Sequence, residues 1–285
     1  MTDNNKFGNR IIIINNLIYY CEILGFKNIY LNSDLNLYIK GNIISDKINI
    51  TMIPSRNIDC HAPYIICFKS IAYPTLYLYY PSYIKPQIRL NLIKNEIKKN
   101  LPKVGINPND LYIHIRSGDI FKPSLNSDYL QPPLCFYQNI INNFKFRKIT
   151  IISQNKNNPI IDKILEQYPN IIYHSQNISI DIAYLSNFYN LVASISSFLL
   201  VAVKFNDNLK IYFEYDIYKN SEKCVHLHHD FYYFPMNFII YRMKPSIRYK
   251  SKILKIFQEE GHYKLMKLMS DAICVNKFTI IKPNV

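Results

Sequence analysis

The chain has 285 residues, 49% of them hydrophobic and 19% charged, which is enough apolar material for one large core or two smaller ones. This composition excludes a chain that is mostly disordered. Lys and Arg outnumber Asp and Glu by 34 to 20, a formal net charge of +14, which favours an acidic partner without selecting a diphosphate, a nucleic acid or a membrane.

The amino-terminal part of the chain has the pattern of a smaller α/β domain. Periodicity predicts a helix at 12–24, a strand at 28–31, and alternating segments at 35–39 and 47–52. The charged stretch 94–103 contains Pro102 and is followed by Gly105, and both residues interrupt regular structure. We therefore expect a boundary there, with domains at 1–104 and 105–285.

From residue 105 onward, short β-branched runs alternate with helix-like segments. The predicted strands are 111–115, 148–153, 171–174, 191–194 and 210–215, and the predicted helices are 133–144, 159–167, 180–189 and 197–205. Pro133 and Pro159 stand where a first helical turn tolerates proline. The alternation predicts an α/β fold with a mostly parallel sheet, in which ligands bind beyond the carboxyl ends of the strands.

The cysteines follow no spacing that indicates a disulfide framework or a metal site. They are Cys21, Cys60, Cys67, Cys135, Cys224 and Cys274. We expect buried free thiols, which suit a reducing compartment. The apolar run at 11–14 is too short for a signal or a membrane span, and no other segment approaches transmembrane length. The sequence therefore predicts a soluble cytoplasmic protein.

Two nitrogen-rich side chains stand at the end of the predicted strand 111–115. His114 and Arg116 fall on one face by the two-residue alternation of a strand, and Asp119 follows in a polar turn. An Arg at such a position needs a partner, and a diphosphate offers a pair of oxygens onto which the guanidinium forks. An ion pair between Arg116 and Asp119 across the turn is the structural alternative.

A second segment combines an acid with a hydroxyl-rich turn. Asp181 stands near the start of the predicted helix 180–189, while Ser196 and Ser197 lie where the predicted strand 191–194 passes into another helix. Hydroxyls and free N–H groups at a helix amino end can bind an anion. The alternative is structural, because serine is a common N-cap and an acid in a first turn favours the helix dipole.

In combination, the His-x-Arg-x-x-Asp pattern of His114, Arg116 and Asp119 and the later Asp-helix-strand-Ser-Ser-Phe unit resemble the superfamily of alpha-1,2-, alpha-1,6- and protein-O-fucosyltransferases. Gly8 and Asn9, at the start of a predicted helix, resemble a Gly-Asn element of these enzymes. The resemblance implies a GT-B-like fold of two Rossmann-like domains, with the donor site in the carboxy-terminal domain. It also implies metal-independent, inverting transfer of fucose, or a related sugar, from a GDP-sugar to a glycan acceptor.

The resemblance further implies roles for residues of the donor site. Arg116 would bind the β-phosphate, assisted by Ser197 and its backbone amide, and Ser196 and Phe198 belong to the same donor-binding segment. Asp181 would accept hydrogen bonds from the amino groups of guanine.

The implied site extends beyond this segment. His114 would contact the nucleotide, and Asn9 would approach the phosphate or the sugar from the amino-terminal domain. Ser117 stands where many relatives have a second Arg, which removes one charge from the group that holds the leaving GDP. The general base for the acceptor stays open between Asp119 and Asp128.

Two other interpretations stay open. The chain could bind a GDP-sugar, another nucleotide or a nucleic acid without catalysis, as its net charge and the basic helix predicted at 251–269 allow, although it has no nucleic-acid-binding motif. The segment 226–230 holds three His and one Asp, but adjacent ligands do not easily close a tetrahedral metal site. We expect no metal.

Overall fold

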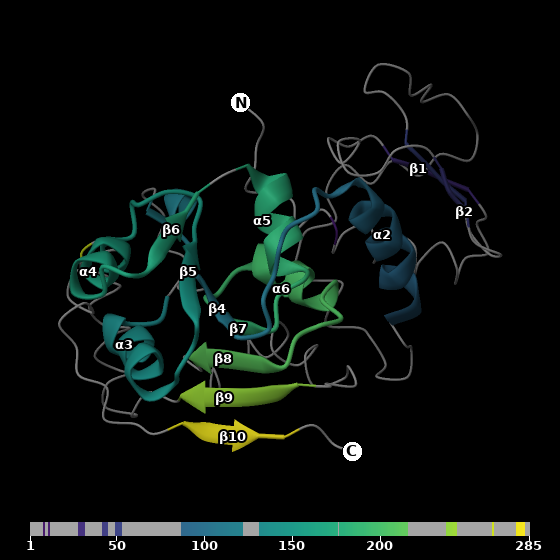
Figure 1. Cartoon of the computed structure of the whole chain (residues 1–285). Helices are drawn as coiled ribbons and strands as arrows, with labels where there is room; N and C mark the ends of the chain where they lie inside the picture. The colour runs from purple at the N-terminus through teal and green to yellow at the C-terminus, as the bar shows by residue number, and fades with distance from the viewer. Residues whose placement is uncertain are drawn as a thin grey trace, which may run out of the picture. The chain divides into compact units, whose positions relative to one another are not determined.

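The computed structural model describes residues 8, 11, 28–31, 42–44, 49–52, 87–121, 131–175, 177–215, 238–243, 264 and 278–282. The chain divides into two compact units, Met1–Pro102 and Lys103–Val285. Each unit contains its own sheet (Figure 1).

The first unit holds a small mixed sheet. The strands β1 (Asn28–Leu31), β3 (Asn49–Met52) and β2 (Asn42–Ile44) lie side by side in that order, with β1 parallel and β2 antiparallel to β3. The strand predicted at 28–31 is confirmed, and the alternating segment 47–52 contains β3, whereas the predictions for 12–24 and 35–39 lie outside the described residues. Helix α2 (Gln87–Asn100) was not expected, because its charged sequence was interpreted as a domain boundary.

The second unit is built on a seven-stranded sheet. Its strands are β4 (Asp110–His114), β5 (Lys148–Ile152), β6 (Ile172–His174), β7 (Asn190–Val192), β8 (Ile211–Tyr215), β9 (Ile239–Met243) and β10 (Thr279–Ile281). Neighbouring strands are parallel except for β9 and β10. The predicted α/β fold with a mostly parallel sheet is therefore confirmed, and β4 to β8 correspond to the five predicted strands.

The strand order indicates where this sheet would bind a ligand. Across the sheet the strands run β10-β9-β8-β7-β4-β5-β6. The chain thus proceeds from β4 to one edge, returns to the other side of β4, and continues outward from β7. This order is compatible with a Rossmann-like fold, and its topological switch point lies between the carboxyl ends of β4 and β7.

Helices cover both faces of the sheet. α3 (Leu134–Asn143) and α4 (Pro159–Gln167) pack on one face, and α5 (Ile178–Leu185) and α6 (Ser197–Lys204) pack on the other (Figure 1). In β4, Ile113 belongs to the α3/α4 core and Tyr112 to the α5/α6 core, as expected of a central parallel strand. No helix in the described part of the chain is long and apolar enough to cross a membrane.

The four helices predicted between residues 133 and 205 are confirmed, with ends that depend on their caps, whereas the basic helix predicted at 251–269 lies outside the described residues except for residue 264. α5 begins at Ile178, before the predicted start, because Asn177 caps it by accepting from the N–H of Ile180 at 3.0 Å. Asn158 caps α4 in the same way, with Pro159 in the first turn as predicted. Pro133 is the N-cap of α3 and not a first-turn residue.

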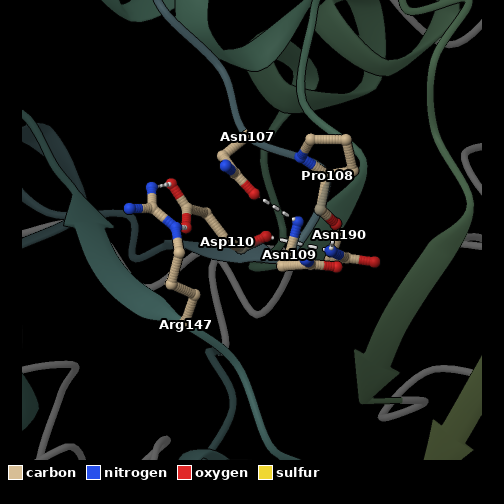
Figure 2. Close-up of polar contacts among 6 residues, drawn as sticks. All are labelled: Asn107, Pro108, Asn109, Asp110, Arg147 and Asn190. Atoms are coloured by element: carbon tan, nitrogen blue, oxygen red, sulfur yellow. Dashed lines mark hydrogen bonds and ion pairs between the residues drawn. The ribbon is translucent and has the colours of Figure 1, made fainter.

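A polar network holds the amino ends of the central strands together, as Figure 2 shows. Arg147, just before β5, donates to both carboxylate oxygens of Asp110 at 2.8 and 2.7 Å. Asn190, the first residue of β7, donates to the backbone oxygens of Pro108 and Asp110 at 2.7 and 2.9 Å. β4, β5 and β7 are therefore fixed at the end opposite to the switch point.

One cysteine departs from the sequence-based expectation. Cys135 is buried and disulfide-bonded, and its partner lies outside the described residues. The prediction of a free thiol is therefore wrong for Cys135. Spacing along the chain could not reveal this, because a disulfide depends on which cysteines the fold brings within bonding distance.

Candidate functional site

The carboxyl ends of β4 and β7 meet at Ser194. The Oγ of this buried serine lies 2.6 Å from Nδ1 of His114, the last residue of β4. It also accepts a hydrogen bond from the backbone N–H of Arg116 at 3.1 Å. These contacts bring the first predicted motif and the loop before α6, which carries Ser196 and Ser197, together at the switch point. Sequence analysis missed Ser194 because it is an uncharged residue 80 positions away from His114.

His114 is a neutral residue with a fixed orientation. Burial, and then the positive charge of Arg116, lower the pKa of its imidazole to about 3. Ser194 Oγ accepts from the Arg116 N–H, and when its own proton is donated to Nδ1 of His114 the ring proton lies on Nε2. The ring of Phe198, from α6, lies beside the imidazole with centroids 6.0 Å apart.

The guanidinium of Arg116 lies at the amino end of α6. Its Nη1 is 3.5 Å from the backbone oxygen of Ile195, the residue before the N-cap Ser196. Gln131 donates to the same oxygen at 3.2 Å. The backbone oxygen of Arg116 accepts from Nδ2 of Asn158 at 3.0 Å. Both the backbone and the side chain of Arg116 are thus positioned by neighbouring loops.

The amino end of α6 lacks the usual serine cap. Ser196 occupies the N-cap position with extended backbone, but its side chain makes no capping hydrogen bond. The interpretation of Ser196 as an N-cap is therefore right about its position at the start of α6, but wrong about a capping hydrogen bond from its hydroxyl. Ser197 is the first helical residue, and its side chain lies outside what the structure describes. The first-turn N–H groups of α6 thus receive no hydrogen bond from the side chain of Ser196.

Ser117 fixes the loop that follows β4. It is 2% exposed, and its Oγ donates to Oδ1 of Asn155 at 2.7 Å and accepts from the backbone N–H of Asn158 at 2.9 Å. Gly118 follows with a φ of 77°, which glycine adopts without strain. The longer Arg side chain cannot occupy this buried position in the same way. The departure from the fucosyltransferase pattern at Ser117 therefore has a structural role.

Asp181 is a buried acid in the first turn of α5. It is 8% exposed, and its Oδ1 makes no hydrogen bond. Burial raises the pKa of its carboxyl to about 7, which means that desolvation outweighs the favourable helix dipole. A buried acceptor without a partner costs about 1–3 kcal/mol, and a ligand with hydrogen-bond donors would recover this cost.

Strand β6, which precedes α5, carries two more unpartnered buried atoms, the hydroxyl of Tyr173 and Nε2 of His174. Nε2 of His174, the last residue of β6, is buried and makes no hydrogen bond. The imidazole meets the ring of Tyr184, from α5, edge to face with centroids 4.9 Å apart. In the register of the sheet, His174 neighbours Ile152, which neighbours His114. Sequence analysis missed His174 because the strand pattern does not distinguish it from a core residue.

Several predicted residues lie outside what the structure describes. These are Asn9, Asp128 and the histidine-rich segment 226–230. Asp119 lies in the short helix η4 (Gly118–Phe121), but its side chain is not described, so the ion pair with Arg116 stays a prediction. Within the described ranges, no three His, Cys, Asp or Glu side chains gather as metal ligands would.

No protein-family model matches the chain, and no curated protein matches it significantly. The resemblance to fucosyltransferases therefore rests on the motifs alone. Independently of that resemblance, the sheet topology and the bonds of Ser194 bring the end of β4 and the loop before α6 to one switch point.

Proposed function

We propose that this chain is an inverting glycosyltransferase that transfers fucose, or a related sugar, from a GDP-sugar to a glycan acceptor. The proposal includes a GT-B-like arrangement, with an acceptor-side domain at 1–104 and a donor-binding domain at 105–285, and no metal cofactor. The observation that supports it most is the position of the Arg116 guanidinium at the amino end of α6, at the switch point of the large sheet.

A diphosphate at the switch point would meet two sources of positive charge. The guanidinium of Arg116 offers a planar pair of donors, and the first turn of α6 offers N–H groups and the positive end of its dipole. Negative charge develops on the β-phosphate as the sugar leaves. Because Arg116 is already positioned, these donors would stabilise that charge with little reorganisation. Arg116 and α6 would thereby take the place of a metal.

The base of the nucleotide would lie towards β6 and α5. β6 is two strands away from β4, about 10 Å at ordinary strand spacing, and the ribose would bridge this separation between diphosphate and base. The unpartnered carboxylate oxygen of Asp181 supports a base with donors. Guanine offers N1–H and its 2-amino group side by side, whereas adenine and uracil do not.

The acceptor hydroxyl would lose its proton to Asp119 or Asp128. An inverting transfer needs one such general base. The backbone of Asp119 lies in η4, three residues after Arg116, which keeps it close to the phosphate end of the donor. His114 is the poorer base, because burial and Arg116 lower its pKa to about 3.

The test combines nucleotide binding with a transfer assay. GDP should raise the melting temperature of the full-length chain more than UDP or ADP at equal concentration. GDP release from GDP-fucose and other GDP-sugars, measured with glycan acceptors, should continue in EDTA. Equal stabilisation by all three nucleotides would contradict the guanine assignment, and activity restored only by manganese would contradict a metal-independent mechanism. GDP binding without transfer would favour the non-catalytic alternative.

A further inference from the structure

Three buried polar side-chain atoms without hydrogen-bond partners belong to β6 and α5. They are the hydroxyl of Tyr173, Nε2 of His174 and Oδ1 of Asp181. His174 and Asp181 are both close to Tyr184, since its ring contacts that of His174 and it follows Asp181 by three positions on one helix face. Neither Nε2 of His174 nor Oδ1 of Asp181 has a partner, so the two do not bond each other. Unsatisfied buried groups are rare in folded proteins, and two of them beside one residue indicate a ligand.

The side chains around His174 suit a flat heterocycle. Ile152, which is 1% exposed, is its neighbour on β5. Tyr184 contacts the imidazole from α5, and its ring is also 5.8 Å from that of Tyr112. Aromatic surfaces of this kind stack on nucleobases. The same row of side chains leads through Ile152 to His114, beside the proposed diphosphate position.

The protonation state of His174 determines what it can offer to a base. Burial, and then the charge of Lys148, lower the pKa of its imidazole. The ring is therefore neutral at pH 7 and carries one proton. With that proton on Nε2, His174 presents a single buried donor, and Asp181, once ionised, presents an acceptor on the same side of the sheet.

We propose that His174 is a specificity-determining residue whose Nε2–H donates to O6 of the guanine that Asp181 binds. On the Watson–Crick edge of guanine, the acceptor O6 stands next to the donors N1–H and the 2-amino group. Asp181 would accept from these two donors while His174 satisfies O6. Adenine carries an amino group where guanine has O6, so it would oppose the donor of His174 with another donor. The inference rests on the proposed function, because it concerns the same nucleotide.

The test compares GDP with 6-thio-GDP, in which a weaker acceptor replaces O6 and the other donors remain. By calorimetry, the wild-type full chain should bind GDP roughly five- to tenfold more tightly. His174→Phe keeps a ring beside Tyr184 but removes Nε2, so it should lose this preference. His174→Gln should restore much of it, because its amide nitrogen can replace Nε2. Tyr168→Phe is the control, since it removes an exposed tyrosine hydroxyl that bonds to Asn142 on the α3/α4 side and should leave the preference for GDP unchanged.

The outcomes separate this inference from the proposed function. A folded His174→Phe variant that keeps the wild-type preference for GDP would overturn the role of His174. A wild-type chain with no preference between GDP and 6-thio-GDP would overturn it as well, without the need for any variant. Tight GDP binding in either case would leave the proposed function intact, whereas absence of GDP binding to the wild type would remove the proposed function itself.

Discussion

Asp181→Asn should change how the stability of the ligand-free protein depends on pH. Burial raises the pKa of the Asp181 carboxyl from 3.8 to about 7. Between these values the folded state keeps a proton that the unfolded chain releases. By linkage, the stability that this group contributes is fully present below its unfolded pKa and is lost as the pH rises through its folded pKa. Asparagine does not titrate, so the variant lacks this loss.

The magnitude follows from the same pKa. From pH 5 to the folded pKa there are about two pH units, each worth about 1.4 kcal/mol, so the wild type should lose about 3 kcal/mol that the variant keeps. Asp181 is only 8% exposed, and solvent therefore screens little of this effect. The free energy of unfolding of Asp181→Asn, relative to wild type, should rise by about 3 kcal/mol between pH 5 and pH 8.

Urea denaturation of both proteins at pH 5 and pH 8 measures this difference. His114 acts in the opposite direction, because its lowered pKa makes the fold lose stability as the pH falls from about 6.5 towards 3. That contribution is present in both proteins and cancels from the comparison. Asp162→Asn, an exposed acid in the first turn of α4, is the matched control. A difference between wild type and Asp181→Asn that does not vary with pH would refute the reasoning.

Two substitutions near the switch point test the phosphate end of the site. Arg116→Lys should stay folded but lower turnover about a hundred- to a thousandfold, since lysine keeps the charge and loses the planar fork. Melting temperature and turnover should be measured on one preparation, and a folded variant with most of its activity would overturn the site. Ser117→Ala should cost about 1–3 kcal/mol in urea denaturation, because it leaves the buried N–H of Asn158 without its acceptor. Ser175→Ala, which removes an exposed hydroxyl, should cost clearly less, and equal losses would contradict the role given to Ser117.

The parallel sheet could be predicted from sequence because its central strands are apolar on both faces. In β4 the run from Leu111 to Ile113 is fully buried between two layers of helices, and this leaves a continuous hydrophobic signal. The order of the strands could not be predicted in this way. It depends on pairing between distant segments, such as the register of Tyr112 with Leu191, and local periodicity carries no information about such pairs.

Charged residues of the site could be recognised from sequence, whereas some of its uncharged residues, such as Ser194 and Asn158, could not. Arg116 and Asp181 are noticeable because a charge beside a buried strand or helix needs a partner. Ser194 and Asn158 are common residue types, and they matter only because the fold places them against the loop after β4. Helix ends were misplaced for a related reason, since Asn177 acts as a cap only through its bond to Ile180.

His114 and His174 lie in one row of the sheet, and they show how the phosphate end and the nucleobase end of the proposed site differ. His114 lies within hydrogen-bonding distance of Ser194, and Arg116 beside it is held by the surrounding loops, so the protein's own contacts organise the phosphate end. His174 and Asp181 each keep a buried atom without a partner. The hydrogen bonds at the nucleobase end would therefore be completed only by the ligand. A mismatched base would leave these atoms unpaired, which is an effective source of selectivity. Changes to the nucleobase of the donor should therefore act mainly on the affinity for the nucleotide, whereas substitution of Arg116 should act mainly on the rate of transfer.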